Sequence, residues 1–198
     1  MSSPVVAGAF AVLDQAHPDW TPAMVKSAVM TAAYQRVRDN DRTSMADPFD
    51  FGSGVLSMGK PTRKGTAFQP GLLYDAGLFE YAAFTCGQEW GVFTPGSCVF
   101  LESIGVPSEA TDLNVPSIGI ASLAGSQTVV RTVTADFGGS GKTLRFRALV
   151  KPPAGYDVEV NPKILKVKDG ETATFEVTIT NKNAPSGEWR FGSLQWSG

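Results

Sequence analysis

The feature that most constrains the fold is a strict alternation of apolar and polar residues late in the chain. From Ala173 to Ile179 every second side chain is apolar, and threonine or glutamate fills the positions between them. Four apolar residues alternate in the same way against Arg145 and Arg147, namely Leu144, Phe146, Ala148 and Val150. Successive side chains of a strand point to opposite faces, so this period of two predicts strands with one buried face.

Further strand-like runs lie at 126–134, 156–160, 164–168 and 188–196, with glycine- and proline-rich turns between them. Six or seven short strands at this spacing predict an antiparallel β-sandwich over 113–198. The run from Gly138 to Thr143 lacks the full phosphate-loop pattern and joins two strands, so we expect a hairpin turn there. Three aromatic residues near the end are expected to pack in the core or between domains, and a ligand platform is the alternative. These are Trp189, Phe191 and Trp196.

Residues 1–35 predict two helices of a buried type. Val5 to Leu13 are apolar or small on every side, which is typical of a helix buried all round. Pro18 ends this helix, and a second helix is expected to begin with Thr21 as its cap and Pro22 in its first turn. Leaving such helices uncovered would forfeit on the order of 10 kcal/mol, so a covering domain is expected.

Residues 36–112 predict an irregular segment that wraps another surface, with a short helix at Leu78–Phe84. Two cysteines, Cys86 and Cys98, lie in this segment. A disulfide between them would close a small loop and contribute roughly 3 kcal/mol. Two unrelated buried thiols are the alternative. We favour the disulfide, because the segment around Trp90 has little else to hold it.

Composition excludes some classes of function. The net charge is −2, from 17 basic and 19 acidic residues, and no basic run occurs, which argues against a nucleic-acid partner. No apolar stretch approaches the ~20 residues of a membrane span. The single histidine, His17, and the two cysteines lack the paired spacing of a zinc site. We therefore expect no metal and no cofactor.

Several motifs occur in the order found in one protein family. They are Met1–Gly8 (MSSPVVAG), 16–22 (AHPDWTP), 26–33 (KSAVMTAA), 48–54 (PFDFGSG), 70–75 (PGLLYD), 112–118 (DLNVPSI) and 184–196 (APSGEWRFGSLQW). Their collinearity resembles the subtilisin-like serine proteases, in the branch best known from plants. Val5 and Gln69 depart from the family pattern, which has His and Asp there.

This resemblance implies that the catalytic serine precedes Met1 by one position and that the catalytic Asp and His lie further upstream. Met1, Ser2, Ser3 and Pro4 would then support the absent nucleophile, and none of them would be catalytic. Thr43-Ser44 copies part of the nucleophile motif, but Arg42 replaces its glycine, so a surface loop is expected there. We expect this chain alone to be inactive.

The resemblance also implies the overall organisation. The fold class is α+β, with post-nucleophile helices at 1–35, a wrapping segment at 36–112 and a fibronectin-III-like sandwich at 113–198. The intact parent would be a secreted serine endopeptidase acting on peptides or proteins, and the partner of this chain would be the parent's own catalytic domain. The alternative function is an independent adhesion or ligand-binding sandwich.

Overall fold

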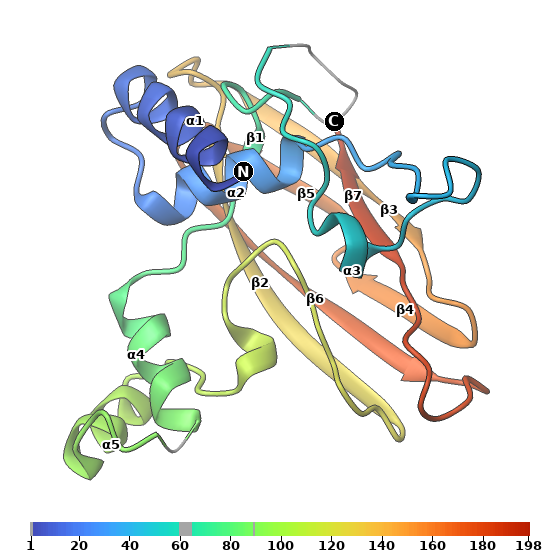
Figure 1. Ribbon diagram of the computed structural model, residues 1–198. Coiled ribbons are helices and arrows are strands. Elements are labelled where there is room, and N and C mark those ends of the chain that lie inside the picture. The colour runs from blue at the N-terminus through green and yellow to red at the C-terminus, as the bar shows by residue number, and fades with distance from the viewer. Residues whose placement is uncertain (1, 60–64, 89) are drawn as a thin grey trace.

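Two antiparallel sheets pack into a sandwich that forms the C-terminal half of the structure. The computed structural model describes residues 2–59, 65–88 and 90–198. The larger sheet has the strand order β1-β2-β6-β4, and the smaller has the order β5-β3-β7. The strands are β1 (Gly71–Leu73), β2 (Ser126–Asp136), β3 (Thr143–Lys151), β4 (Tyr156–Asn161), β5 (Ile164–Lys168), β6 (Thr172–Asn181) and β7 (Ser193–Ser197). The predicted α+β class with an antiparallel sandwich is confirmed (Figure 1).

From β2 onward, each connection carries the chain from one sheet to the other, because β2, β4 and β6 belong to one sheet and β3, β5 and β7 to the other. The prediction of a hairpin at Gly138–Thr143 is therefore wrong, since β2 and β3 lie in different sheets. This turn is held by Asp169, whose carboxylate accepts from the Gly141 backbone and the Ser140 hydroxyl, each at 3.1 Å. Alternation identifies a strand but carries no information on which sheet it joins.

The sandwich core forms from the alternate residues that the sequence places on one face. Its buried side chains include Val129, Val133, Val167, Phe175 and Val177. Trp196 packs edge to face on Phe175, with ring centroids 5.0 Å apart. On the opposite face of the β2–β6 pair, hydroxyl pairs join the two strands across the register. These pairs are Ser126–Thr180, Thr128–Thr178 and Thr132–Thr174.

Two helices form the N-terminal part, α1 (Ser2–Ala16) and α2 (Pro22–Ala32). Helix α2 begins as predicted, because the Thr21 hydroxyl accepts from the Met24 backbone N–H at 3.1 Å and Pro22 occupies the first turn. Together with Leu73 and Ala67, these helices build a second core. Its fully buried members include Leu13 and Ala28.

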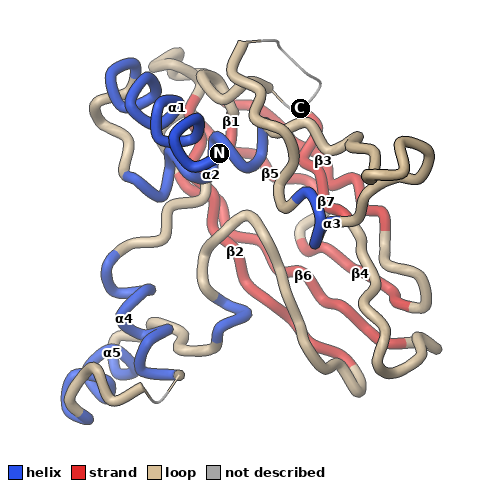
Figure 2. The backbone as a smooth tube through the Cα atoms, viewed as in Figure 1, coloured by secondary structure: helices blue, strands red, loops and turns tan. Residues whose placement is uncertain are grey.

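The middle segment is mostly loop but carries several short elements (Figure 2). These are α3 (Pro48–Phe51), β1, α4 (Leu78–Gly87), α5 (Pro95–Ser103) and the 3-10 turn η1 (Ala110–Asp112). The predicted helix at Leu78–Phe84 is confirmed as α4 and runs three residues longer. Helices α3 and α5, the turn η1 and strand β1 were not predicted.

Candidate functional site

The residues predicted to support a nucleophile lie at the start of α1. Ser2, Ser3 and Pro4 are exposed in its first turn, while Met1 lies outside the described residues. The first backbone N–H groups of a helix have no partner within the helix and carry the positive end of its dipole. The first turn of α1 therefore presents backbone N–H donors and the positive end of the helix dipole.

Helix α1 is buried along one narrow stripe of this chain. Ala9 and Leu13, four residues apart, are its buried side chains. Val5 and Val12 are 60% and 50% exposed, although both are branched apolar residues. The sequence predicted a helix buried on every side, and within this chain most of that apolar surface is uncovered. Burying a valine side chain fully contributes ~1.5–3 kcal/mol. A surface that packed on this face of α1 would therefore gain binding free energy from each valine.

The rings of His17 and Trp20 connect the end of α1 to the sandwich. His17 stacks on Trp20 with ring centroids 3.8 Å apart and an interplanar angle of 11°. The His17 Nε2 atom lies 3.1 Å from the Phe68 carbonyl oxygen, which can only accept, so Nε2 donates. Trp20 Nε1 donates to the Asp136 carboxylate at the end of β2 at 2.6 Å. His17 therefore connects the end of α1 to the Phe68 loop and to Trp20.

Strand β1 joins the helical part to the sandwich through its own backbone. It pairs with β2, Leu72 opposite Ala135. Leu72 packs in the sandwich core, whereas the next residue, Leu73, packs in the core of the helices. Side chains alternate across a strand, so three residues serve both cores. The buried Ser27 hydroxyl of α2 also accepts from the Tyr74 backbone N–H at 2.9 Å.

A buried arginine holds the segment that leads into the sandwich. Arg131 lies on the core-facing side of β2 and is 2% exposed. Its guanidinium donates to the carbonyls of Val115, Val130 and Ser117 at 3.1, 2.8 and 3.2 Å. Burial lowers the pKa of Arg131, and burial raises the pKa of Tyr74 to about 12 against the opposing charge of Arg131. The buried guanidinium thus holds the loop that leads into β2.

The same segment protects the edge of β2 that β1 leaves unpaired. The Asn114 amide donates to the Thr132 carbonyl at 2.9 Å and accepts from its N–H at 3.0 Å, which mimics one step of a strand ladder. The Asp112 carboxylate accepts from the Val130 N–H at 3.1 Å. Side chains that occupy an exposed edge prevent pairing with another chain.

The remaining chemical candidates are not brought together. Thr43 and Ser44 donate their backbone N–H groups to the Asp41 carboxylate at 2.8 and 2.9 Å, which forms a surface loop as predicted. Hydrogen bonds from Ser44 and Thr43 hold the pKa of Asp41 below its ordinary value.

Across the described ranges, no group of three His, Cys, Asp or Glu side chains is placed to hold a metal ion. No described helix is long and apolar enough to cross a membrane.

The three aromatic residues near the end of the chain separate into two groups. Trp196 packs in the sandwich, whereas Trp189 is 55% exposed and lies before β7. The Trp189 and Phe191 rings each meet Phe49 of α3 edge to face, at 5.0 and 5.1 Å. They therefore connect the middle segment to the sandwich, and packing between segments describes them better than a flat platform.

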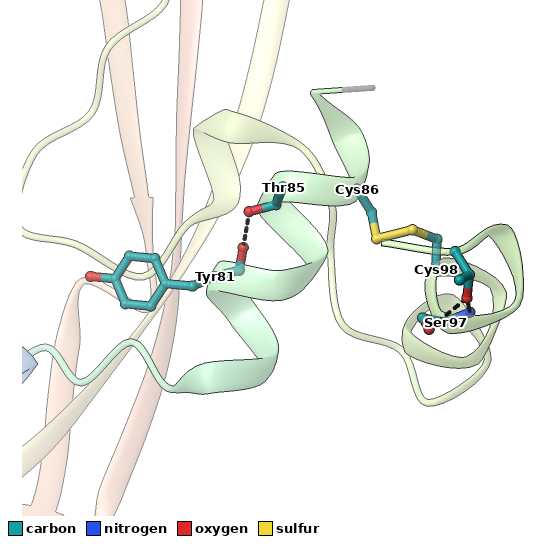
Figure 3. Close-up of a disulfide and its surroundings, with 6 residues drawn as sticks. Tyr81, Thr85, Cys86, Ser97 and Cys98 are labelled. Atoms are coloured by element: carbon teal, nitrogen blue, oxygen red, sulfur yellow. Dashed lines mark hydrogen bonds between the residues drawn. A yellow bond between two sulfur atoms is a disulfide. The ribbon is translucent and has the colours of Figure 1, made fainter. Parts of the chain in front are cut away.

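Cys86 and Cys98 form a disulfide between α4 and α5, with Cα atoms 5.7 Å apart (Figure 3). The prediction treated the segment between them as a loop. Instead, Thr94 caps a helix that starts at Pro95, and its hydroxyl accepts from the Ser97 N–H. The Thr-Pro pair is the signal that located α2, so α5 could have been found in the same way.

Comparison with known proteins assigns the two ends of the chain. Residues 1–54 match a family model described as "Subtilase family", and 112–198 match one described as "Fibronectin type-III domain". The whole chain is 33% identical over 208 residues to the subtilisin-like protease SBT3.2 of Arabidopsis thaliana, covering 27% of it. It is 34% identical over 212 residues to SBT3.1 of the same plant, covering 26% of that protein. The chain thus spans about a quarter of the length of the curated relatives it matches.

Proposed function

Because the chain belongs to the subtilase family and carries a fibronectin type-III domain, we propose that it is the part of a secreted serine endopeptidase that braces the catalytic domain. The observation that carries this proposal is the uncovered apolar face of α1, where Val5 and Val12 are half or more exposed. An isolated helix of this composition has little stability in water, because its apolar side chains stay exposed. A catalytic domain packed on this face would supply the missing burial.

In this proposal Met1, Ser2, Ser3 and Pro4 directly follow the nucleophilic serine of the intact enzyme. The N–H groups and dipole at the start of α1 would stabilise negative charge that develops beside that serine. The chain itself would contribute no Asp-His-Ser triad. His17 follows the far end of α1, about 20 Å away at 1.5 Å per residue, and its Nε2 already donates to Phe68.

The proposed division is 1–35 as catalytic-domain helices, 36–112 as the wrapping segment and 113–198 as the sandwich. Two contacts would hold α1 in place against the sandwich. They are the Trp20–Asp136 hydrogen bond and strand β1, which packs into both cores. Peptide-bond hydrolysis would belong to the intact protein, with peptides or proteins as its substrates.

The test compares the same substitution in two contexts. In the chain alone, Val5→Asp should leave the unfolding temperature nearly unchanged, because an exposed substitution usually costs less than ~0.5 kcal/mol. In a protein that joins the chain to its upstream coding sequence, Val5→Asp should abolish peptide hydrolysis or lower its thermal stability by several degrees. Ile164→Asp on β5, at a position 52% exposed, is the matched control and should be neutral in both.

The upstream-extended protein should hydrolyse a casein substrate, and a serine-directed inhibitor should block it, while the chain alone should do neither. Hydrolysis by the pure chain, or an extended protein indifferent to Val5→Asp, would overturn the proposal. Specific binding of a ligand by the chain, together with no effect of Val5→Asp in the extended protein, would favour an independent binding module.

A further inference from the structure

Helices α4 and α5 form a disulfide-linked hairpin that extends away from the sandwich (Figure 1). Its internal core is very small, since Ala83 and Leu101 are its buried side chains. Phe84 and Trp90 add one edge-to-face contact at 5.9 Å. The disulfide replaces the core that such a short pair of helices lacks, and it fixes one helix against the other.

The outer surface of this hairpin is unusually apolar. Leu78 and Phe79 of α4 are 80% and 54% exposed, and Val99 and Phe100 of α5 are 63% and 54% exposed. The exposed large apolar side chains of the hairpin are Leu78, Phe79, Tyr81, Trp90, Val92, Phe93, Val99, Phe100 and Ile104. Large apolar side chains exposed in such number on one small unit mark an interaction site more often than singly scattered ones do.

The charged residues of the stretch that contains the hairpin have a single sign. No lysine, arginine or histidine occurs between Gly65 and Val130. The acidic residues of this stretch that the structure describes are Asp75, Glu80, Glu102, Glu109 and Asp112. Glu102 and Glu109 are exposed at and beyond the end of α5. A partner that pairs its charges with the exposed carboxylates of Glu102 and Glu109, here called the acidic rim, must be basic. A second copy of the hairpin would bring like charges together.

The hairpin lies between the two stretches that the family models match, 1–54 and 112–198. The face proposed to meet the catalytic domain is on α1, a different element. The curated relatives align over the hairpin as well as over the two matched stretches. The disulfide holds the two helices rigid, which lowers the entropy lost when a partner binds.

We propose that the α4–α5 hairpin is a docking site for a separate polypeptide segment that is amphipathic and basic, with apolar side chains for the exposed patch and Lys or Arg for its acidic rim. An amphipathic helix laid along an apolar surface is a common mode of peptide recognition. This inference goes beyond the proposed function, because it concerns the exposed side chains of the hairpin and not the uncovered face of α1.

The test measures binding of a labelled 14-residue Leu/Lys amphipathic peptide to the chain by fluorescence anisotropy. Phe100→Ser should weaken binding about tenfold or more, as expected when most of a large apolar contact is lost. Glu102→Lys should weaken it several-fold, and the effect should shrink as salt rises. Ile164→Ser, at a similarly exposed position on β5, should not change binding.

A Leu/Glu peptide of the same pattern should bind at least tenfold more weakly than the Leu/Lys peptide. Thermal unfolding of each variant establishes that the chain is folded, and Glu102→Lys supplies a second variant if Phe100→Ser misfolds. Absence of binding by the Leu/Lys peptide, or equal binding by both peptides, would overturn the proposal. Light scattering that shows a dimer abolished by Phe100→Ser would assign the surface to a second copy instead.

Discussion

Strand β1 makes a sharp prediction because adjacent residues of one short strand pack into different cores. Leu73 is fully buried among the helices, and Leu72 is buried in the sandwich. Replacing a buried leucine by alanine removes transfer energy and leaves a cavity, at a cost of about 2–5 kcal/mol. We expect Leu73→Ala to destabilise the helical part by this amount and Leu72→Ala to destabilise the sandwich.

Hydrogen exchange followed by mass spectrometry separates the two effects. A local loss of about 2 kcal/mol raises the open fraction roughly 30-fold. Leu73→Ala should therefore speed the exchange of α2, whose face carries the buried Val25 and Ala28, and leave β6 near its original rate. Leu72→Ala should produce the opposite pattern, with faster exchange in β2 and β6.

Each leucine variant is the control for the other, because the residues share a strand and a side-chain type. Equal acceleration in α2 and β6 by both variants would mean that the two cores unfold as one unit. No acceleration by Leu73→Ala would mean that β1 does not hold the helices. Either result would refute the reasoning that this strand joins two separable cores.

Three further predictions concern the disulfide, the buried arginine and one acidic turn. Changing Cys86 and Cys98 to serine should cost about 3 kcal/mol within the hairpin and speed exchange in α4 and α5. Arg131→Met should lower the free energy of unfolding, measured in urea, by about 1–3 kcal/mol for each carbonyl left buried without a hydrogen-bond donor. These are the carbonyls of Val115 and Ser117. The hydrogen bond from the Phe137 N–H holds the pKa of Asp169 low, so its stabilisation is present above pH ~4 and lost as pH falls. Asp169→Asn should therefore lower the unfolding temperature more at about pH 7 than at about pH 3.

These predictions have distinct contrary outcomes. An unchanged exchange rate in α5 after loss of both cysteines would mean that helix packing holds the hairpin without the disulfide. Full stability of Arg131→Met would indicate that water reaches the carbonyls. An effect of Asp169→Asn that is the same at both pH values would exclude a contribution from the carboxylate charge. Ser2→Ala, at an exposed position, serves as the neutral control for all three.

The strands could be predicted from the sequence because alternation is a local property. The runs at 126–134, 156–160 and 164–168 each lie within a strand of the structure, and the run at 188–196 shortened to β7. Strand β1 could not be found in this way, since the three residues Gly71–Leu73 are too few to display a period. Its identity depends on pairing with β2, which is a property of the tertiary structure.

The contacts that connect the two ends of the chain also could not be predicted from a local sequence pattern. Trp20 and Asp136 are 116 residues apart, and no local pattern relates them. Arg131 differs, because Val129 and Val133 flank it at alternate positions, so the pattern of β2 already places it on the buried face. A charged residue at a core position of an alternating strand is a local signal, and it indicates that carbonyl or carboxylate partners lie nearby.

The pairing and hydrogen bonds at the edge of β2 indicate that the folded sandwich includes residues before 113. The family match starts at 112, yet Leu72 fills part of the core, and β1 pairs with the end of β2. A fragment of 113–198 would lose Leu72, the β1 pairing and the bond from Val130 to Asp112. It would expose an unpaired strand edge, which promotes association between chains. We therefore expect 113–198 to be less stable and more prone to aggregation than a fragment that starts before β1, because β1 completes the sandwich.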